Sequence, residues 1–292
     1  MINTKTLLPY KTMPVWTAQS IPKAFLEKHN TKEGTWAKLT ILSGSLVFYQ
    51  LSPDGEEISR HIFDASSDIP FVDPQVWHKV SPNSPDLSCY LTFYCQKEDY
   101  FHKKYGLTRT HSEVIASAPL LSEKSNNILD LGCGQGRNSL YLSLLGHQVT
   151  SVDSNGQSLV ALENMALEEE LPYNIKWYDI NTATIEGHYD FILSTVVFMF
   201  LNPDCISDII LQMQSHTQIG GYNLIVSAMD TTENPCPLPF PFTFKEGQLK
   251  SYYNDWEIIK YNENLGELHR VDENGNRLKL QFATLLARKL RS

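Results

Sequence analysis

The sequence has no long apolar run. No stretch approaches the roughly 18 apolar residues that a membrane-spanning helix needs, and residues 1–14 lack the apolar core of an export signal. We therefore expect neither membrane insertion nor export, and we expect the protein to be cytoplasmic.

Cysteine is sparse and unpatterned. The cysteines are odd in number, and none belongs to a C-x-x-C pair. They are Cys89, Cys95, Cys133, Cys205 and Cys236. This usage argues against a disulfide framework or a structural zinc site and suits a reducing compartment.

Clusters of Lys and Arg are also missing. The chain has 24 Lys and Arg residues against 33 Asp and Glu, a formal net charge of -9. This charge opposes a phosphate backbone, so nucleic acid is excluded as the main partner. With 42% hydrophobic and 20% charged residues, the 292-residue chain has a globular composition and is long enough for two domains.

The most informative stretch is residues 128–139, ILDLGCGQGRNS. An apolar run ends at the alternating glycines Gly132, Gly134 and Gly136, and an apolar-periodic helix follows. At such a turn the backbone can approach a ligand closely, and unpaired N–H groups can hold a nucleotide or a carboxylate. A second short strand ends at Asp153, about 20 residues beyond the first glycine, where an acid can hold a ribose diol.

Two cofactors fit this arrangement, NAD and S-adenosyl-L-methionine (SAM). The dinucleotide fingerprint G-x-G-x-x-G needs a third glycine where Arg137 stands, and the sequence instead reads D-x-G-x-G-x-G from Asp130. A carboxylate at this strand end suits the cationic amino-acid part of SAM and repels a pyrophosphate. We therefore favour SAM, because a turn without a ligand would leave Asp130 and Asp153 unexplained.

Successive strand ends contribute to the predicted SAM site. The glycine turn should hold the methionine part with its backbone, with Asp130 near the ammonium. The second strand end should hold the ribose, the third the adenine, and the fourth should flank the sulfonium. The predicted cofactor-binding residues are Asp130, Gly132, Cys133, Gly134, Arg137, Asn138, Asp153, Ser154, Asp179, Ile180, Thr195 and Val196.

The first third of the chain has a different pattern. Short β-like segments between residues 35 and 95 are separated by Gly, Pro and Asn turns, which predicts an antiparallel sandwich or barrel. Gly44 and residues 74–78 resemble the two half-motifs of the cupin barrel, although the usual His-x-His motif is missing. We predict a cupin-like β domain at 1–96, for docking, dimerisation or sensing, and a SAM-dependent methyltransferase domain at 97–292.

Three isolated histidines, His29, His61 and His78, could in principle be metal ligands in the β domain. Single histidines are more often core or surface residues than ligands. No metal is therefore expected.

From residue 97 onward, strands and helices alternate as in a parallel α/β sheet. A turn at Gly220-Gly221 precedes the fifth predicted strand, and an Asn-Gly hairpin at 272–276 joins two final antiparallel strands. The predicted strands are 128–131, 149–153, 174–178, 189–196, 222–229, 258–271 and 277–288. Seven strands with the last pair antiparallel are the architecture of class I methyltransferases, a Rossmann-like fold.

Two segments are candidate lids. Helices predicted at 97–106 and 111–121 precede the SAM-binding strand, and the proline-rich segment 234–242 is held extended by its four prolines. The lid candidates are Tyr100, Tyr105, Arg109, His111 and Cys236. The alternative is a connector with solvated charges and, for Cys236, simple packing.

Four stretches of the second domain resemble the tellurite-resistance methyltransferase family TehB. They are DLGCGQGRNSLYL at 130–142, STVVFMFL at 194–201, GGYNLIV at 220–226 and GELHRVDENGNR at 266–277. The first stretch alone would mark only a class I methyltransferase, whereas the others are more specific. The likeness covers about residues 97–292, and the N-terminal third resembles the cupin-like extension of the family's long form.

The resemblance implies SAM-dependent methylation of tellurite, with selenium oxyanions such as selenite as further substrates. Tellurium has a lone pair that can attack without loss of a proton, so no general base is required, but an oxyanion needs cationic donors. The predicted catalytic residues are His269, Arg270 and Arg277, on facing strands of the hairpin. Alternatively, the arginines are exposed strand residues that pair with neighbouring acids.

Two other functions remain open. The enzyme could methylate a small organic thiol or another nucleophile, which would need a base and an apolar pocket such as Phe240 and Phe242 could line. The chain could also be a sensor in which SAM or an anion shifts the two domains without turnover. The expected partner is a small inorganic oxyanion, with no membrane, no nucleic acid and a homodimer as one option.

Overall fold

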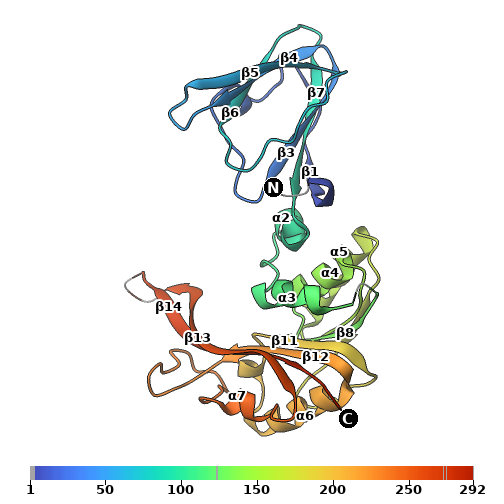
Figure 1. Cartoon of the computed structure of the whole chain (residues 1–292), viewed down its shortest axis with the longest axis vertical. Coiled ribbons are helices and arrows are strands. Elements are labelled where there is room, and N and C mark those ends of the chain that lie inside the picture. The colour runs from blue at the N-terminus through green and yellow to red at the C-terminus, as the bar shows by residue number, and fades with distance from the viewer. Residues whose placement is uncertain (1–3, 123, 272, 274, 292) are drawn as a thin grey trace. The chain divides into compact units, whose positions relative to one another are not determined.

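The computed structural model describes residues 4–122, 124–271, 273 and 275–291, and of 267–271 only the backbone. The chain forms two compact units, Met1–Arg109 and Thr110–Ser292 (Figure 1). Each unit has its own sheets and its own core. The domain boundary near residue 96 stays a prediction.

The first unit consists of two antiparallel sheets, which confirms the predicted all-β domain. Strand β7 pairs with β1, β2 and β3 in one sheet, and β4 lies between β5 and β6 in the other. The strands are β1 Leu8–Thr12, β2 Trp16–Thr17, β3 Trp36–Ser43, β4 Ser45–Leu51, β5 Glu57–Asp64, β6 His78–Pro82 and β7 Ser88–Cys95. The short helices are η1 Thr4–Thr6, α1 Lys23–Leu26, η2 Lys97–Asp99 and α2 Tyr100–Tyr105.

Apolar side chains of both sheets share one core. Ala37 and Ile41 come from β3, Leu91 from β7 and Leu46 from β4. Gly44 joins β3 to β4 with a φ of +67°, and a Cβ there would lie 2.6 Å from the backbone nitrogen of Leu87. Only glycine fits this close approach.

The second unit is a seven-stranded sheet in the order β10-β9-β8-β11-β12-β14-β13. The strands β10, β9, β8, β11 and β12 are parallel, β14 is antiparallel to β12, and β13 is antiparallel to β14. The strands are β8 Asn127–Leu131, β9 Gln148–Asp153, β10 Asn174–Trp177, β11 Tyr189–Thr195, β12 Thr217–Ala228, β13 Glu257–Val271 and β14 Arg277–Arg288. This arrangement confirms the predicted class I methyltransferase fold.

Helices cover both faces of the sheet (Figure 1). Alternate residues of each strand face opposite sides, so Ile128 packs with α3 and α4, while Leu129 packs with α6 and α7. The helices are α3 Ser112–Ser117, η3 Ala118–Leu120, α4 Arg137–Leu144, α5 Gly156–Glu168, η4 Phe198–Phe200, η5 Pro203–Cys205, α6 Ile206–His216 and α7 Gln248–Ser251. Every helix that the structure describes is too short or too polar to cross a bilayer.

The turn predicted at Gly220-Gly221 is wrong, because both residues lie inside β12. The strand bulges there: Tyr189 of β11 pairs with Thr217, whereas Phe191 pairs with Tyr222. Gly220 has a φ of +84°, and a Cβ on Gly221 would lie 2.7 Å from the carbonyl oxygen of Asp190. The two glycines therefore permit a bulge within the strand.

Candidate functional site

The glycine turn after β8 is fixed by the neighbouring strand β9. The carbonyl oxygen of Val152 accepts hydrogen bonds from the backbone nitrogens of Gly132, at 2.9 Å, and Cys133, at 3.0 Å. Gly132 has a φ of +77°, and a Cβ there would lie 2.5 Å from Cγ2 of Val197. The residue must therefore be glycine for the chain to turn this closely against the segment after β11.

Asp153 connects the end of β9 to the glycine turn. Its Oδ2 accepts a hydrogen bond from the backbone nitrogen of Gly134 at 2.8 Å, and its Oδ1 accepts one from that of Asn155 at 2.8 Å. Each carboxylate oxygen keeps a further lone pair. Asp153 is half-buried, so a ligand hydroxyl can still reach it.

A pocket of about 300 Å³ opens at the carboxyl ends of these strands. It brings together the predicted residues Gly132, Asp153, Ser154, Asp179, Ile180 and Val196. Ligands of open α/β sheets bind at this edge, where the strand order reverses.

Five residues that sequence reasoning missed also line the pocket: Tyr178, Asn181, Val197, Phe200 and Leu201. Asn181 had a signal in the sequence, because it follows the predicted adenine residues Asp179 and Ile180. Oδ1 of Asp179 accepts hydrogen bonds from the backbone nitrogen of Asn181 at 3.0 Å and from its Nδ2 at 3.1 Å. Phe200 had no such signal in the sequence, because it is the backbone turn of η4 that brings it into the pocket.

Val196 adopts an unusual backbone conformation at the end of β11. Its φ is +62°, a region that β-branched residues rarely occupy. Its backbone nitrogen donates to the carbonyl oxygen of Val226 at 2.7 Å, which holds it in place. Such strain concentrates at functional sites, and the place of Val196 beside the sulfonium stays a prediction.

Asp130 lies behind the pocket and does not line it. The side chain is buried, and the Ser139 hydroxyl donates to its Oδ2 at 2.6 Å. Burial raises the pKa of Asp130 to about 6, against the opposing effects of Ser139 and of the Arg137 charge. Its predicted role near the ammonium of SAM stays a prediction.

Asp130→Asn should remove part of the pH dependence of stability. Because the pKa of Asp130 is about 6 in the folded chain and about 4 when unfolded, the folded state binds the extra proton between these values. The free energy of unfolding therefore falls as pH rises from about 4 to about 6, and falls less in the Asn variant. Urea unfolding at about pH 4 and about pH 6 measures this change in the free energy of unfolding. The control is Asp204→Asn, because Asp204 is exposed. Equal pH dependence of wild type and Asp130→Asn would contradict the prediction.

The predicted residues Asn138 and Thr195 contact each other. Nδ2 of buried Asn138 donates to Oγ1 of Thr195 at 3.0 Å, and its Oδ1 accepts from the backbone nitrogen of His111 at 3.0 Å. Cys133 is buried too, and burial raises the pKa of its thiol. These residues support the glycine turn and the end of β11 from behind.

The lid candidates are divided between the two units. Tyr100, Tyr105 and Arg109 belong to the first unit, and their lid role stays a prediction. His111 is the N-cap of α3, where its Nδ1 accepts from the backbone nitrogen of Glu113 at 3.2 Å. Burial lowers the pKa of His111 to about 4, so the ring is neutral near pH 7.

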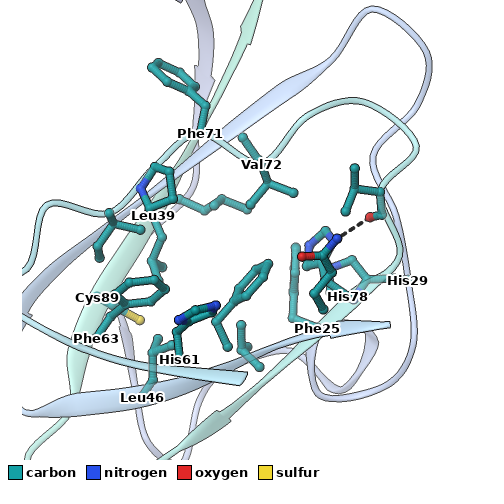
Figure 2. Close-up of a pocket in the computed structure, with 18 of the residues that line it drawn as sticks. Phe25, His29, Leu39, Leu46, His61, Phe63, Phe71, Val72, His78 and Cys89 are labelled. Carbon is teal, nitrogen blue, oxygen red and sulfur yellow. Dashed lines mark hydrogen bonds between the residues drawn. The ribbon is translucent and has the colours of Figure 1, made fainter. Parts of the chain in front are cut away.

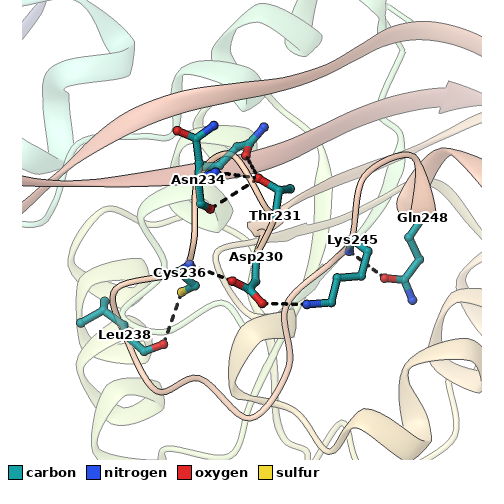
Figure 3. A network of polar contacts seen from close by, with 8 residues as sticks. Asp230, Thr231, Asn234, Cys236, Leu238, Lys245 and Gln248 are labelled. Carbon is teal, nitrogen blue, oxygen red and sulfur yellow. Dashed lines mark hydrogen bonds and ion pairs between the residues drawn. The ribbon is translucent and has the colours of Figure 1, made fainter.

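Cys236 and its proline-rich segment pack beside the pocket. Oδ1 of Asp230 accepts from the backbone nitrogen of Cys236 at 2.9 Å, and Oδ2 pairs with Nζ of Lys245 at 2.7 Å (Figure 3). Cys236 packs in one cluster with Val196. Asp230 and Lys245 therefore hold the segment against the end of β11.

The predicted catalytic residues of the hairpin are not among those that line the pocket. Arg277 is exposed at the start of β14, on the strand face opposite Leu280, which packs with Val196. His269 and Arg270 lie in β13, but their side chains lie outside the described residues. The catalytic role of all three stays a prediction.

The first unit contains the three histidines considered as metal ligands. His29 and His78 lie with ring centroids 4.2 Å apart. Among the described residues, no group of three or more His, Cys, Asp or Glu side chains could hold a metal ion.

The sheet order, the glycine turn and the acids at successive strand ends define a class I SAM-dependent methyltransferase. Comparisons with known proteins agree. Residues 93–286 match the family model described as tellurite resistance protein TehB, and residues 11–91 match the TehB-like domain. The chain belongs to the TehB family and is a SAM-dependent methyltransferase, which confirms the predicted family, enzyme class and cofactor.

Individual relatives cover four fifths of the chain or more. A Haemophilus influenzae (strain 10810) protein named probable S-adenosyl-L-methionine-dependent methyltransferase TehB is 58% identical over 283 residues, covering 97% of this chain and 98% of the relative. The crystal structure of TehB from Haemophilus influenzae matches with a TM-score of 0.95 and 57% identity, covering 98% of this chain and 100% of that one. An Eikenella corrodens protein named hemagglutinin 1 is 46% identical over 241 residues, covering 82% of this chain and 80% of that protein.

Proposed function

We propose that this methyltransferase transfers the methyl group of SAM to tellurite, and also to selenium oxyanions. The family description supports the acceptor. One structural observation bears on the acceptor: among the described residues that line the pocket, none is His, Lys, Arg or Cys, so no such base is positioned there, and the cationic donors that an oxyanion needs are proposed on the hairpin instead. The pocket's carboxylates, Asp153 and Asp179, already accept backbone N–H groups.

This composition favours an acceptor that needs no deprotonation. A thiol or an alcohol must lose a proton to attack, which calls for a positioned base. Tellurite carries a lone pair on tellurium and needs no such group. The proposed tasks of the chain are therefore positioning and exclusion of water.

The residues at the strand ends fit SAM. Gly132 lets the backbone approach without a Cβ, Asp153 can accept the ribose hydroxyls, and Asp179 can accept the adenine amino group. Asp130 supplies negative charge behind the glycine turn for the ammonium. When bound, SAM supplies a methyl group on a sulfonium, which the lone pair on tellurium takes without any proton transfer.

Product analysis tests the proposal. The purified chain with SAM should release S-adenosylhomocysteine only when tellurite or selenite is added, and mass spectrometry should detect a methyl group bound to tellurium. Release with thiols but not with tellurite would replace the acceptor with an organic one. SAM binding without release for any acceptor would favour a sensor.

Arg277→Ala tests the hairpin's proposed contact with the oxyanion. We expect kcat with tellurite to fall about tenfold or more, because a cationic donor that orients the anion is lost, and SAM affinity to stay within about threefold. Lys279→Ala is the matched control, an exposed cation two residues along the same face of β14. Unchanged kcat in Arg277→Ala would remove Arg277 from the catalytic site.

A further inference from the structure

The first unit contains a partly open cavity of about 250 Å³ between its two sheets. Leu39 and Cys89 reach it from one sheet, and Leu46 and Phe63 from the other (Figure 2). Close-packed protein interiors leave few voids larger than a water molecule. A partly open space of this size, lined mainly by apolar side chains, is therefore a candidate small-molecule site.

Aromatic side chains surround the cavity and remain partly accessible. Phe25, Phe48, Phe63 and Phe71 all line it, and each is half-buried instead of fully buried. Half-buried aromatic rings around a concave space are typical of small-molecule pockets. The lining is suited to a flat apolar ring system.

The lining argues against a charged ligand. Among the residues that the structure describes, the lining contains no Lys or Arg and a single carboxylate, the exposed Asp73, which already accepts a hydrogen bond from Nε1 of Trp36 at 3.0 Å. An anion would find no Lys or Arg among these lining residues, and a buried charge without a partner is costly. The cavity is therefore unsuited to the oxyanion substrate proposed for the second unit.

Three histidines, His29, His61 and His78, line the cavity, and backbone contacts fix the ring hydrogen of two of them. Nδ1 of His78 lies 2.8 Å from the carbonyl oxygen of Val76, and Nδ1 of His29 lies 2.9 Å from that of Glu27. A carbonyl only accepts, so each Nδ1 carries the hydrogen and each Nε2 keeps a lone pair. Burial lowers the pKa of His29, and that of His78 to about 4, so both rings are neutral near pH 7.

The backbone holds these rings in place. His29 and His78 exchange two backbone hydrogen bonds, of 3.0 and 2.8 Å. The ring of Phe48 stacks on that of His78 at a centroid distance of 5.3 Å. Ordered acceptors beside an aromatic wall favour a ligand with one polar hydrogen and a flat apolar body.

We propose that this cavity binds one uncharged aromatic molecule with a single hydrogen-bond donor, a phenol or an indole of one or two rings. The rings lie against Phe48 and Phe63, and the donor points to Nε2 of His78 or His29. An apolar cavity of about 150 Å³ in another protein holds benzene, so this one has room for two fused rings. The site is separate from the methyltransferase pocket and extends the function beyond methyl transfer.

Calorimetric titration of the full chain tests this, with saturating S-adenosylhomocysteine present to occupy the second unit. The probes are 2-naphthol, naphthalene, which lacks the donor, and 2-naphthoate, which is anionic. We expect 2-naphthol to bind about tenfold more tightly than naphthalene, the effect of one hydrogen bond, and 2-naphthoate not to bind. No saturable binding of 2-naphthol, or equal binding of 2-naphthoate, would overturn the proposal.

Variants locate the site. Val72→Phe should fill the cavity and abolish binding of both neutral probes, whereas Val160→Phe, on the exposed face of α5, should change nothing. His29→Leu or His78→Leu should lower 2-naphthol affinity about tenfold and leave naphthalene unchanged. Undiminished binding by Val72→Phe would place the ligand elsewhere, and unchanged 2-naphthol affinity in both His variants would overturn the proposed hydrogen bond.

Discussion

Gly132→Ala is expected to weaken SAM binding by about a hundredfold or more, because the turn leaves no room for a Cβ. Gly132 has a φ of +77°, and an added Cβ would lie 2.5 Å from Cγ2 of Val197, a residue that lines the pocket. Either the turn or Val197 must move. Both movements alter the proposed SAM site, and the left-handed backbone adds strain of its own.

Gly146→Ala is the matched control for Gly132→Ala. Gly146 also has a positive φ, +96°, but a Cβ there would meet nothing within 4 Å. It should lose stability to backbone strain alone and keep its SAM affinity. Calorimetric SAM titration and urea unfolding of both variants measure the two effects, and a SAM affinity of Gly132→Ala within about threefold of wild type would contradict the prediction.

Asp153→Ala should weaken SAM binding by roughly 1 to 3 kcal/mol, about five- to 150-fold. The variant loses the proposed acceptor for the ribose and also leaves the backbone nitrogen of Gly134 without the carboxylate that fixes it. We therefore expect the variant to lose more SAM affinity than turnover at saturating SAM.

The control for Asp153→Ala lies at the opposite edge of the same sheet. Oδ2 of Asp190 accepts a hydrogen bond from the backbone nitrogen of Asn127 at 2.8 Å. The bond from Gly134 to Asp153 has the same length. Asp190→Ala removes a comparable bond at the start of β8 and should leave SAM affinity unchanged. Equal losses of SAM affinity in the two variants would show that Asp153 acts only through the stability of the fold.

The sequence predicts much of the cofactor pocket because its chemistry is local. A glycine with a positive φ and an acid at a strand end are each set by a few neighbouring residues, so Gly132, Asp153 and Asp179 could be named from spacing alone. The conformation of Val196 could not, because it depends on the hydrogen bond to Val226 of the adjacent strand. Phe200 is turned into the pocket by η4 and packs edge-on against Phe240 of a distant segment, a contact that no local pattern encodes.

The β domain shows the same limit at larger scale. Its strands were predictable from turn residues and alternation, and His29 and His78 stood out as polar residues. Their common cavity was not predictable, because it arises where two sheets fail to fill the space between them. The turn predicted at Gly220-Gly221 is wrong for a related reason. Glycine is favoured both in a turn and in a bulge, and only the pairing with the neighbouring strand distinguishes the two.

The burial of Cys133 also bears on how the enzyme tolerates its own proposed substrate. Tellurium(IV) oxyanions oxidise thiols, and the reactive form of cysteine is the thiolate. Burial raises the pKa of the thiols of Cys89, Cys95 and Cys133, in the case of Cys95 to about 12, so these three stay protonated at neutral pH. The buried cysteines in the cores of both units thus offer an oxidant almost no thiolate at neutral pH.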